Sequence, residues 1–394
     1  MLAACDAPPP AALTQEAYVW QRTWTTPVSA AVRSRELDLD GLRVLALQWI
    51  GEHRIATAPD LQALMARGLP LRLVLRIEGS RPRLPVATVA AAIRSALTEW
   101  QTHGLHVVGV EIDHDCASAG LDDYADWLSQ LKSALPNGIA LSTTALPSWL
   151  DNPAGLRALR EVAYESVLQV HAVEARQTHL LDPDQALRWA ADWQAHADRP
   201  FRIALPAYRL RVRHDALGGV LAVEGEGHGE LGGNAAVERF ALPEDVARVV
   251  RELAQHPPTA LRGLVWFRLP VSKDRLGWSA QTLAHVMHGE TPRAQIALLA
   301  TARGDGLFDL QLQNIDVVDG LAPTHITLPA ACGLVEGNGA FAASDSAAQL
   351  HASQTLWLAP EQRVAIGFAR CAVQLPERTA LTHSDQTMDT PASQ

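Results

Sequence analysis

The 394-residue chain contains only four cysteines, and none lies in a Cys-x-x-Cys pair or in the Cys/His spacing of a zinc site. It has no cluster of lysine or arginine and a formal net charge of −10, so we expect no nucleic-acid partner. No apolar run approaches the ~20 residues of a membrane-spanning helix. What remains, 48% hydrophobic and 19% charged residues, is typical of a globular protein.

The first thirteen residues match a lipoprotein processing site. Leu2-Ala3-Ala4-Cys5 fits the bacterial lipobox, whose cysteine is lipidated, and the following Pro/Ala-rich stretch resembles a tether. The charged and apolar segments that normally precede a lipobox are missing, so either translation starts upstream of Met1 or the match is accidental. We expect a lipid anchor on Cys5, at the periplasmic face of a bacterial cell envelope.

The remaining cysteines are consistent with that setting. Cys332 and Cys371 lie in the C-terminal part of the chain and could form a disulfide in an oxidising compartment. Cys116 is left without such a partner, next to an acidic cluster.

Short apolar segments alternate with amphipathic ones over residues 14–292, which predicts an α/β fold with parallel strands. Eight repeats over this length favour a (β/α)8 TIM-type barrel, and no Gly-x-Gly-x-x-Gly follows the first strand to favour an open doubly wound sheet. The predicted strands are 17–22, 43–49, 71–78, 106–113, 139–144, 166–171, 202–207 and 262–268. The predicted helices are 60–67, 85–103, 121–135, 152–162, 183–197, 243–256 and 279–288.

Two further regions depart from this pattern. A glycine-rich insertion at 209–239 follows the seventh strand, and we interpret it as a lid or hairpin at the catalytic face, or as a surface ornament. Residues 293–376 read as short strands separated by Gly, Asp, Asn and Pro, which predicts a small β-sandwich. Residues 377–394 are polar and are expected to be a disordered tail.

The fourth predicted strand carries Glu111, Asp113 and Asp115 at every second position. Because side chains alternate between the two faces of a strand, the three carboxylates share one face and the apolar residues between them share the other. Burying unpaired acids costs several kcal/mol. The pattern therefore predicts a functional site.

Polar or aromatic residues recur at the ends of the other strands, where a (β/α)8 barrel has its active site. The candidates for substrate binding are Arg76, Glu78, Trp149, Gln169, His171, Tyr208, Trp266 and Arg268. Ser142 and Thr144 also fall there, and Trp20, Arg22, Gln48 and Trp49 do so with less certain orientation. Arg76 with Glu78 could instead form a structural ion pair, and His171 could be a core histidine.

Acid–base catalysis is the chemistry that this triplet favours. Alternate strand residues lie about 6–7 Å apart, so their charges couple and raise the pKa of one acid. A protonated carboxyl near neutral pH can donate to the leaving oxygen of a glycosidic bond. A divalent-metal site is the other use of three acids, but we expect no metal and no cofactor.

The segment Gly109-Val110-Glu111-Ile112-Asp113-His114-Asp115 resembles the fourth-strand signature of family 18 glycoside hydrolases, Asp-Gly-x-Asp-x-Asp-x-Glu. The resemblance implies Asp115 as general acid and Asp113 as the residue that orients the substrate's acetamido group, which itself attacks the anomeric carbon. Glu111 would be the inner support and Trp266 the floor of the sugar site. The chain departs from the signature at Val108, Glu111 and Asp115, the last being one methylene shorter than glutamate.

Over a longer span the chain resembles a bacterial family of unknown function, domain-of-unknown-function family 3142. The matching stretches are 110–115 (VEIDHD), 141–150 (LSTTALPSWL) and 167–171 (VLQVH). This second resemblance supports the fold and the envelope setting and implies no activity.

Together these features predict a monomeric, envelope-associated protein that hydrolyses a polysaccharide or glycan. The alternatives are a catalytically inactive glycan-binding lipoprotein and a metal-dependent hydrolase or deacetylase.

Overall fold

The computed structural model describes residues 13–79, 84–171, 179–196, 199–214, 220–224, 236–272, 274–344 and 348–381. The chain divides into two compact units, residues 1–291 and 292–394. Cys5 and the expected tether residues before Leu13 lie outside the described residues.

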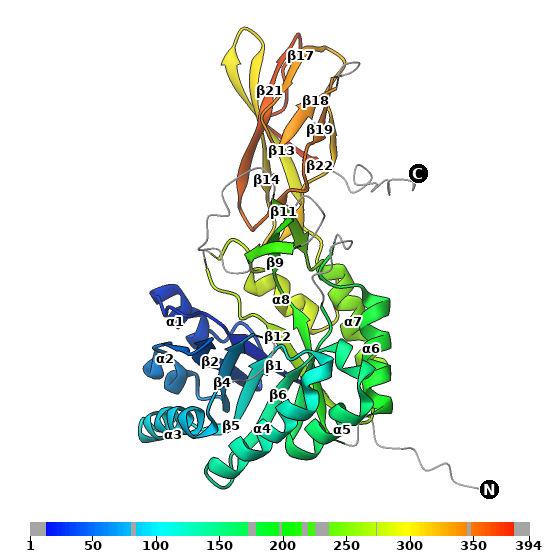
Figure 1. Cartoon of the computed structure of the whole chain (residues 1–394). Helices are drawn as coiled ribbons and strands as arrows, with labels where there is room; N and C mark the ends of the chain where they lie inside the picture. Colours follow the sequence, from blue (N-terminus) through cyan, green and yellow to red (C-terminus); the bar gives the residue numbers. More distant parts are fainter. Residues whose placement is uncertain are drawn as a thin grey trace, which may run out of the picture. The chain divides into compact units, whose positions relative to one another are not determined.

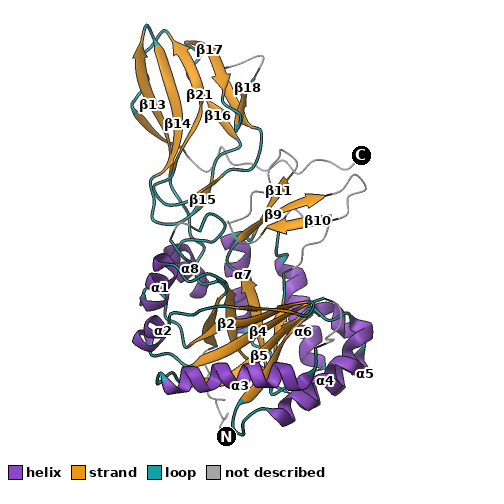
Figure 2. Ribbon diagram, turned by 60° about the vertical axis from the view of Figure 1, so that its left-hand side comes forward, coloured by secondary structure: helices purple, strands orange, loops and turns teal. Residues whose placement is uncertain are grey.

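The first unit is a closed barrel of eight parallel strands with helices around it (Figures 1 and 2), so the prediction of a (β/α)8 barrel is confirmed. The strand order is β1-β12-β8-β7-β6-β5-β4-β2, and pairing between β1 and β2 closes the ring. The barrel strands are β1 (Thr14–Val19), β2 (Gly41–Ile50), β4 (Leu71–Glu78), β5 (Val107–His114), β6 (Ala140–Ala145), β7 (Glu165–Gln169), β8 (Phe201–Pro206) and β12 (Leu261–Phe267).

Eight α-helices surround the described part of the barrel, and several begin at side-chain caps. Asp60, Asn152 and Asp182 each accept a hydrogen bond from the backbone three residues ahead, and a proline follows each of the last two. The helices are α1 (Thr26–Arg33), α2 (Leu61–Arg67), α3 (Val86–Thr102), α4 (Leu121–Ala134), α5 (Pro153–Val162), α6 (Pro183–Ala195), α7 (Pro243–Gln255) and α8 (Ala280–Met287). Short 3-10 turns, η1 (Ser118–Gly120) and η2 (Pro147–Asp151), precede α4 and α5.

Two described elements of the barrel unit outside the insertion, α1 and β3, were not predicted. The helix α1 is only eight residues long, and its apolar Val28 and Val32 give too short a pattern to recognise. The strand β3 (His53–Ala56) folds back on β2 as an antiparallel hairpin. The described part of the insertion forms β9 (Arg209–His214), β10 (Val220–Glu224) and β11 (Ala236–Phe240), a three-stranded antiparallel sheet rather than a single hairpin.

The second unit contains antiparallel sheets around its own apolar core, in agreement with the predicted β-sandwich. One sheet has the order β17-β21-β14-β13-β22, with β13 (Ile296–Gly304), β14 (Leu307–Asn314), β17 (Cys332–Gly337), β21 (Arg363–Cys371) and β22 (Arg378–Leu381). A second sheet has the order β16-β19-β18, with β16 (His325–Thr327), β18 (Phe341–Ala343) and β19 (Gln349–Ala352). The short strands β15 (Gly320–Leu321) and β20 (Trp357–Leu358) pair with each other.

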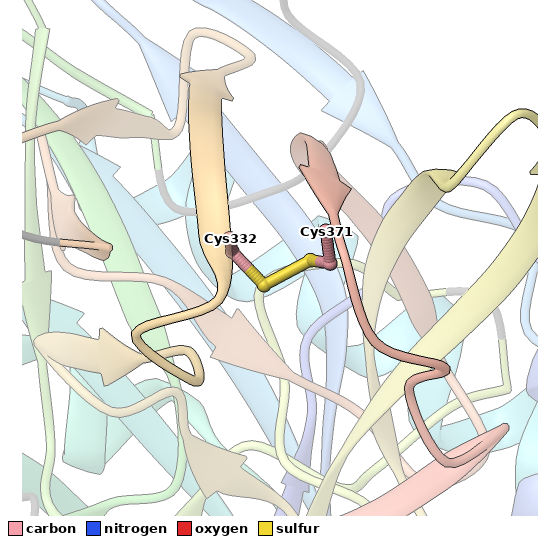
Figure 3. The surroundings of a disulfide bond; sticks show 2 residues. All are labelled: Cys332 and Cys371. Atoms are coloured by element: carbon pink, nitrogen blue, oxygen red, sulfur yellow. A yellow bond between two sulfur atoms is a disulfide. The ribbon is translucent and has the colours of Figure 1, made fainter.

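Cys332 and Cys371 occupy facing positions on β17 and β21 and are joined by a disulfide (Figure 3). The boundary expected at residue 376 is too early, because β22 pairs with β13 and extends the sheet to Leu381. The expectation of disorder is therefore wrong for residues 378–381, and residues 382–394 lie outside the described part of the chain.

Candidate active site at the carboxyl end of the barrel

The three acids of β5 lie at increasing exposure along one face. Glu111 is fully buried, Asp113 is nearly so, and the side chain of Asp115, just after the strand, is 48% exposed. Val110 and Ile112, on the opposite face, are completely buried. The alternation expected from the sequence is therefore present, but only the last of the three acids is open to solvent.

Glu111 belongs to a group of buried ions that we call the buried charge layer. The layer consists of Glu16, Arg43, Arg72, Glu111, Glu165 and Arg202, from six different strands. Arg43 is its centre: its Nε donates to Glu16 at 2.6 Å, its Nη2 donates to Glu165 at 2.7 Å, and its Nη1 donates to Glu111. This layer closes the barrel interior below Asp113.

The charges within the layer are balanced by neighbours rather than by water. Burial raises the pKa of Glu165, but Arg43, Arg72 and Arg202 together lower it to about 2. Burial raises the pKa of Glu111 despite Arg43 and the hydroxyl of Tyr18, which donates to it at 2.5 Å. Glu111 is thus enclosed by protein donors away from solvent, which fits the expected role of inner support rather than direct contact with a substrate.

Sequence reasoning missed the other members of the layer. Each is a charged residue near the start of a largely apolar strand, such as Arg43 in Gly41–Ile50 or Glu165 in Glu165–Gln169. A lone charge at the same place in several strands of one barrel was the available signal, because unpaired burial of each would be costly.

Above the layer lies a second group, which we call the rim cluster: Arg76, Glu78, Asp113, Asp115 and Thr144. Arg76 bridges two acids, since its Nη1 donates to Asp113 and its Nη2 lies 3.3 Å from Asp115 Oδ2. Thr144 Oγ1 donates to the other oxygen of Asp113 at 2.8 Å. Asp113 is therefore held on both oxygens, whereas Asp115 has one long contact.

Glu78 is fixed from the opposite side. Gln48 Nε2 donates to Glu78 at 2.5 Å, and Arg22 Nε donates to Gln48 at 2.7 Å. Arg76 Nε also lies 3.8 Å from Glu78. The predicted pairing of Arg76 with Glu78 exists, as one part of a wider network along β2 and β4.

Asp115 has the environment of a proton donor. Its partial burial and the neighbouring charge of Asp113 raise its pKa, and Arg76 acts against them. The side chain nevertheless remains about half exposed. An exposed carboxyl with a raised pKa is the form in which an acid can protonate a bound group.

Aromatic rings cover the barrel interior beside these acids. Phe267 lies at its centre, with ring centroids 5.2 Å from Trp20, 5.3 Å from Tyr208, 5.7 Å from Tyr18 and 6.3 Å from His171. The guanidinium of Arg76 lies 5.8 Å from the ring centroid of Trp20, within cation–π range. Phe267 was not among the predicted residues, and Trp20 was only a weaker candidate.

His171 and Tyr208, both predicted, line this aromatic group. Burial lowers the pKa of His171 to about 4, so the imidazole is neutral near pH 7. Its Nδ1 is buried and has no hydrogen-bond partner among the described residues. Burial raises the pKa of Tyr208 to about 12, with Arg268 acting against it. Gln169 is half-buried at the end of β7.

Two predicted tryptophans do not belong to the site. Trp266 is fully buried, and its Nε1 donates to Gln15 Oε1 at 2.7 Å, so Phe267 rather than Trp266 faces the barrel interior. Trp149 is also fully buried, and its Nε1 donates to the carbonyl of Cys116 at 2.7 Å. Neither ring can form the floor of a sugar site.

Arg268, another predicted site residue, forms an ion pair with Asp274. Its Nη2 donates to Asp274 at 2.5 Å and its Nε to the same oxygen at 3.1 Å. Its charge also acts on Tyr208, where it opposes the rise in pKa that burial causes.

No group of three or more His, Cys, Asp or Glu among the described residues is placed to hold a metal ion. No described helix combines the length and hydropathy that crossing a membrane requires. A cavity of about 350 Å³ lies away from the acids of β5, beside α1, and is lined by apolar side chains such as Leu37 and Trp278 and by polar ones such as Glu36 and Arg67.

Residues 67–272, more than half of the chain, match the family described as domain of unknown function (DUF3142). The chain belongs to this family. The match includes the acids of β5, Phe267 and the whole rim cluster. No curated protein matches the chain.

The chain is similar to solved structures. The spore cortex-lytic enzyme SleL of Bacillus megaterium QM B1551 is 12% identical, over 71% of this chain and 74% of that one, with a TM-score of 0.50. A chitinase from Bacteroides thetaiotaomicron is 10% identical, over 71% of this chain and 98% of that one, with a TM-score of 0.46. The likeness to the first shows the chitinase-like (β/α)8 fold, and at this identity it shows the fold alone.

Proposed function

We propose that this DUF3142 protein binds a glycan at the carboxyl end of its barrel and hydrolyses a glycosidic bond, with Asp115 as general acid. The observation that carries the proposal is the position of Asp115. It is a half-exposed carboxyl whose pKa is raised, next to an anchored Asp113 and beside a group of aromatic rings. A sugar ring above Phe267 or Trp20 would have an apolar face to stack on and polar groups around its edge.

In this reaction Asp115 donates its proton to the glycosidic oxygen as the bond to the anomeric carbon breaks. Asp113, fixed by Arg76 and Thr144, orients the group that attacks that carbon. The resemblance to family 18 implies that this group is the acetamido oxygen of the substrate. Water then opens the resulting ring and returns the proton to Asp115. The name of the SleL neighbour, a cortex-lytic enzyme, is in keeping with a glycan substrate.

We further propose that the protein works in the bacterial envelope, anchored by a lipid on Cys5. The Cys332–Cys371 disulfide supports an oxidising compartment. Labelled palmitate should be incorporated into the chain expressed from its own gene, upstream sequence included, and not into the Cys5→Ser variant made in the same way; equal labelling of the two would reject the anchor.

One observation favours a second function, glycan binding without cleavage. Arg76 contacts both Asp113 and Asp115, so the same guanidinium holds the two acids that the reaction needs. If this arrangement persists when a glycan binds, the acids can only accept hydrogen bonds from sugar hydroxyls.

The test is a glycan-release assay with the full chain on chitin oligomers, poly-N-acetylglucosamine, peptidoglycan and β-glucans. We expect Asp115→Asn to lower the rate by about 10²–10⁴-fold, the usual contribution of a general acid. Asp126→Asn, a matched exchange on the exposed surface of α4, should keep full activity. No product from the parent, together with a reproducible increase in Tm on adding one glycan, would support binding and reject hydrolysis on this panel.

A further inference from the structure

Two histidines of the second unit face each other across neighbouring strands. His325 of β16 is the register partner of His351 of β19. The backbone N–H of Ala352 donates to Thr324 at 2.8 Å, which makes Thr324 and Ala352 a hydrogen-bonded pair and places the two histidines at the adjacent non-hydrogen-bonded pair. At such positions of an antiparallel sheet the side chains approach most closely. Their ring centroids are 4.6 Å apart, with the planes at 87°.

The pair lies on the outer face of its sheet. Ile326 and Leu350, the neighbours of the histidines along the strands, are buried in the core of the unit, so His325 and His351 point the other way. On the far side of His351 the register partner is Ala342, whose methyl group leaves space above the sheet. His325 is exposed to solvent.

One ring is already oriented by a neighbour. The hydroxyl of Thr324 and the Nδ1 of His325 lie 2.9 Å apart, in hydrogen-bond contact. A ring nitrogen that is engaged in this way fixes the imidazole and leaves the Nε2 for another partner, which is how metal-binding histidines are commonly oriented.

The geometry points to a two-histidine site for a borderline transition-metal ion, and we propose that His325 and His351 bind Cu²⁺, Ni²⁺ or Zn²⁺ here. With metal–nitrogen bonds of about 2.0–2.1 Å, two imidazoles on one ion have ring centroids about 4.5–5 Å apart, which matches the observed spacing. Imidazole nitrogen suits these ions, and Mg²⁺ or Ca²⁺ prefers oxygen. Water or an added ligand completes the coordination.

The competing explanation is a simple edge-to-face contact between two imidazole rings, which needs no ion. The metal site and the simple ring contact predict different results when one histidine is replaced. A metal site needs both imidazoles at once, because each supplies one ligand nitrogen to the same ion. A ring contact alone gives no stoichiometric binding.

The experiment is equilibrium dialysis of the untagged, metal-stripped full chain against Cu²⁺, Ni²⁺, Zn²⁺ and Mg²⁺ at neutral pH. We expect one ion per chain for the first three, with Cu²⁺ tightest, and none for Mg²⁺. His325→Asn and His351→Asn should each weaken binding by about tenfold or more. His53→Asn, an exposed histidine of the first unit, is the matched control and should leave binding unchanged.

Electron paramagnetic resonance of the Cu²⁺ form supplies an independent readout, because two coordinated imidazoles give a two-nitrogen hyperfine pattern that each single variant reduces. Both variants lie on the surface and should keep the Tm of the parent. The proposal is overturned if the parent binds no stoichiometric ion, or if binding survives both substitutions in one chain. It is independent of hydrolysis at the barrel, so an inactive protein leaves this result unaffected.

Discussion

The buried charge layer and the rim cluster both hold carboxylates that project from the same face of β5. Each places a carboxylate of β5 against an arginine: Glu111 against Arg43 in the layer, and Asp113 against Arg76 at the rim. In the layer, protein partners enclose every charge. At the rim, the Arg76 side chain is 25% exposed and that of Asp115 48% exposed. The ion pair itself is similar, and the difference lies in what surrounds it.

This difference separates a structural use of charge from a chemical one. A closed set of buried ions contributes to stability only as a whole, because removing one member leaves its partners unpaired away from water. An open set tolerates a change of partner, since solvent or a ligand can replace a lost contact. The layer therefore fixes the barrel interior, and the rim remains available to a substrate.

The largest expected effect on stability comes from removing the central arginine of the buried charge layer. Arg43→Met leaves Glu16, Glu111 and Glu165 without their common partner and should lower the free energy of unfolding by about 3–5 kcal/mol. Urea denaturation followed by tryptophan fluorescence measures it, because every tryptophan except Trp357 lies in the first unit. Arg76→Met is the matched exchange at the rim and should cost less, because Asp113 keeps the hydroxyl of Thr144 and Asp115 keeps its contact with solvent. Equal losses of stability in the two variants would contradict the distinction between the buried charge layer and the rim cluster.

The second effect is acid sensitivity. The pKa of Glu165 is about 2 in the folded protein against an ordinary 4.5, so its ionised form stabilises the fold above about pH 4.5 and this contribution disappears as the pH falls toward 2. It amounts to about 3 kcal/mol at most. The free energy of unfolding, measured at intervals from pH 5 to pH 2, should fall in the parent. Glu165→Gln should be less stable from the start but less dependent on pH, and parallel curves would contradict this account.

The smallest effect on stability, and the most informative for function, concerns Asp115. Arg76 lowers the pKa of Asp115, so Arg76→Met should raise it further, whereas Arg76→Lys should change it less because the charge is retained. Carbon NMR of labelled aspartate side chains follows the titration directly and needs no activity. If the proposed hydrolysis is found, its alkaline limit should move to higher pH in Arg76→Met. An unchanged titration of Asp115 would show that the two side chains are not coupled.

The sequence alone was sufficient for the barrel, because buried parallel strands and amphipathic helices have distinct periodicities. Facing was harder. Both the order of Glu111, Asp113 and Asp115 and their common face followed from alternation within β5. For the eighth barrel strand the same reasoning chose Trp266, one position from the residue that faces inward. A shift of one residue reverses every side chain of a strand, and a run such as Val265-Trp266-Phe267 is apolar on both faces.

Partners across the barrel could not be read from the sequence either. Arg43 contacts Glu111 and Glu165 through the centre of the ring, at 68 and 122 residues' separation. Alternation within one strand says that a charge points inward and does not say which opposite charge meets it. The division between a closed layer and an open rim therefore became visible only in three dimensions.

The pairing of β22 with β13 has a consequence for how the second unit is made. Ile296 is the first residue of β13 and pairs with Leu381, the last residue of β22. The two paired strands are therefore synthesised far apart in time. Until β22 arrives, β13 presents unsatisfied backbone groups to any other extended chain nearby. Completion of this sheet is a late, non-local event. The unit is therefore most exposed to mispairing just before its synthesis ends.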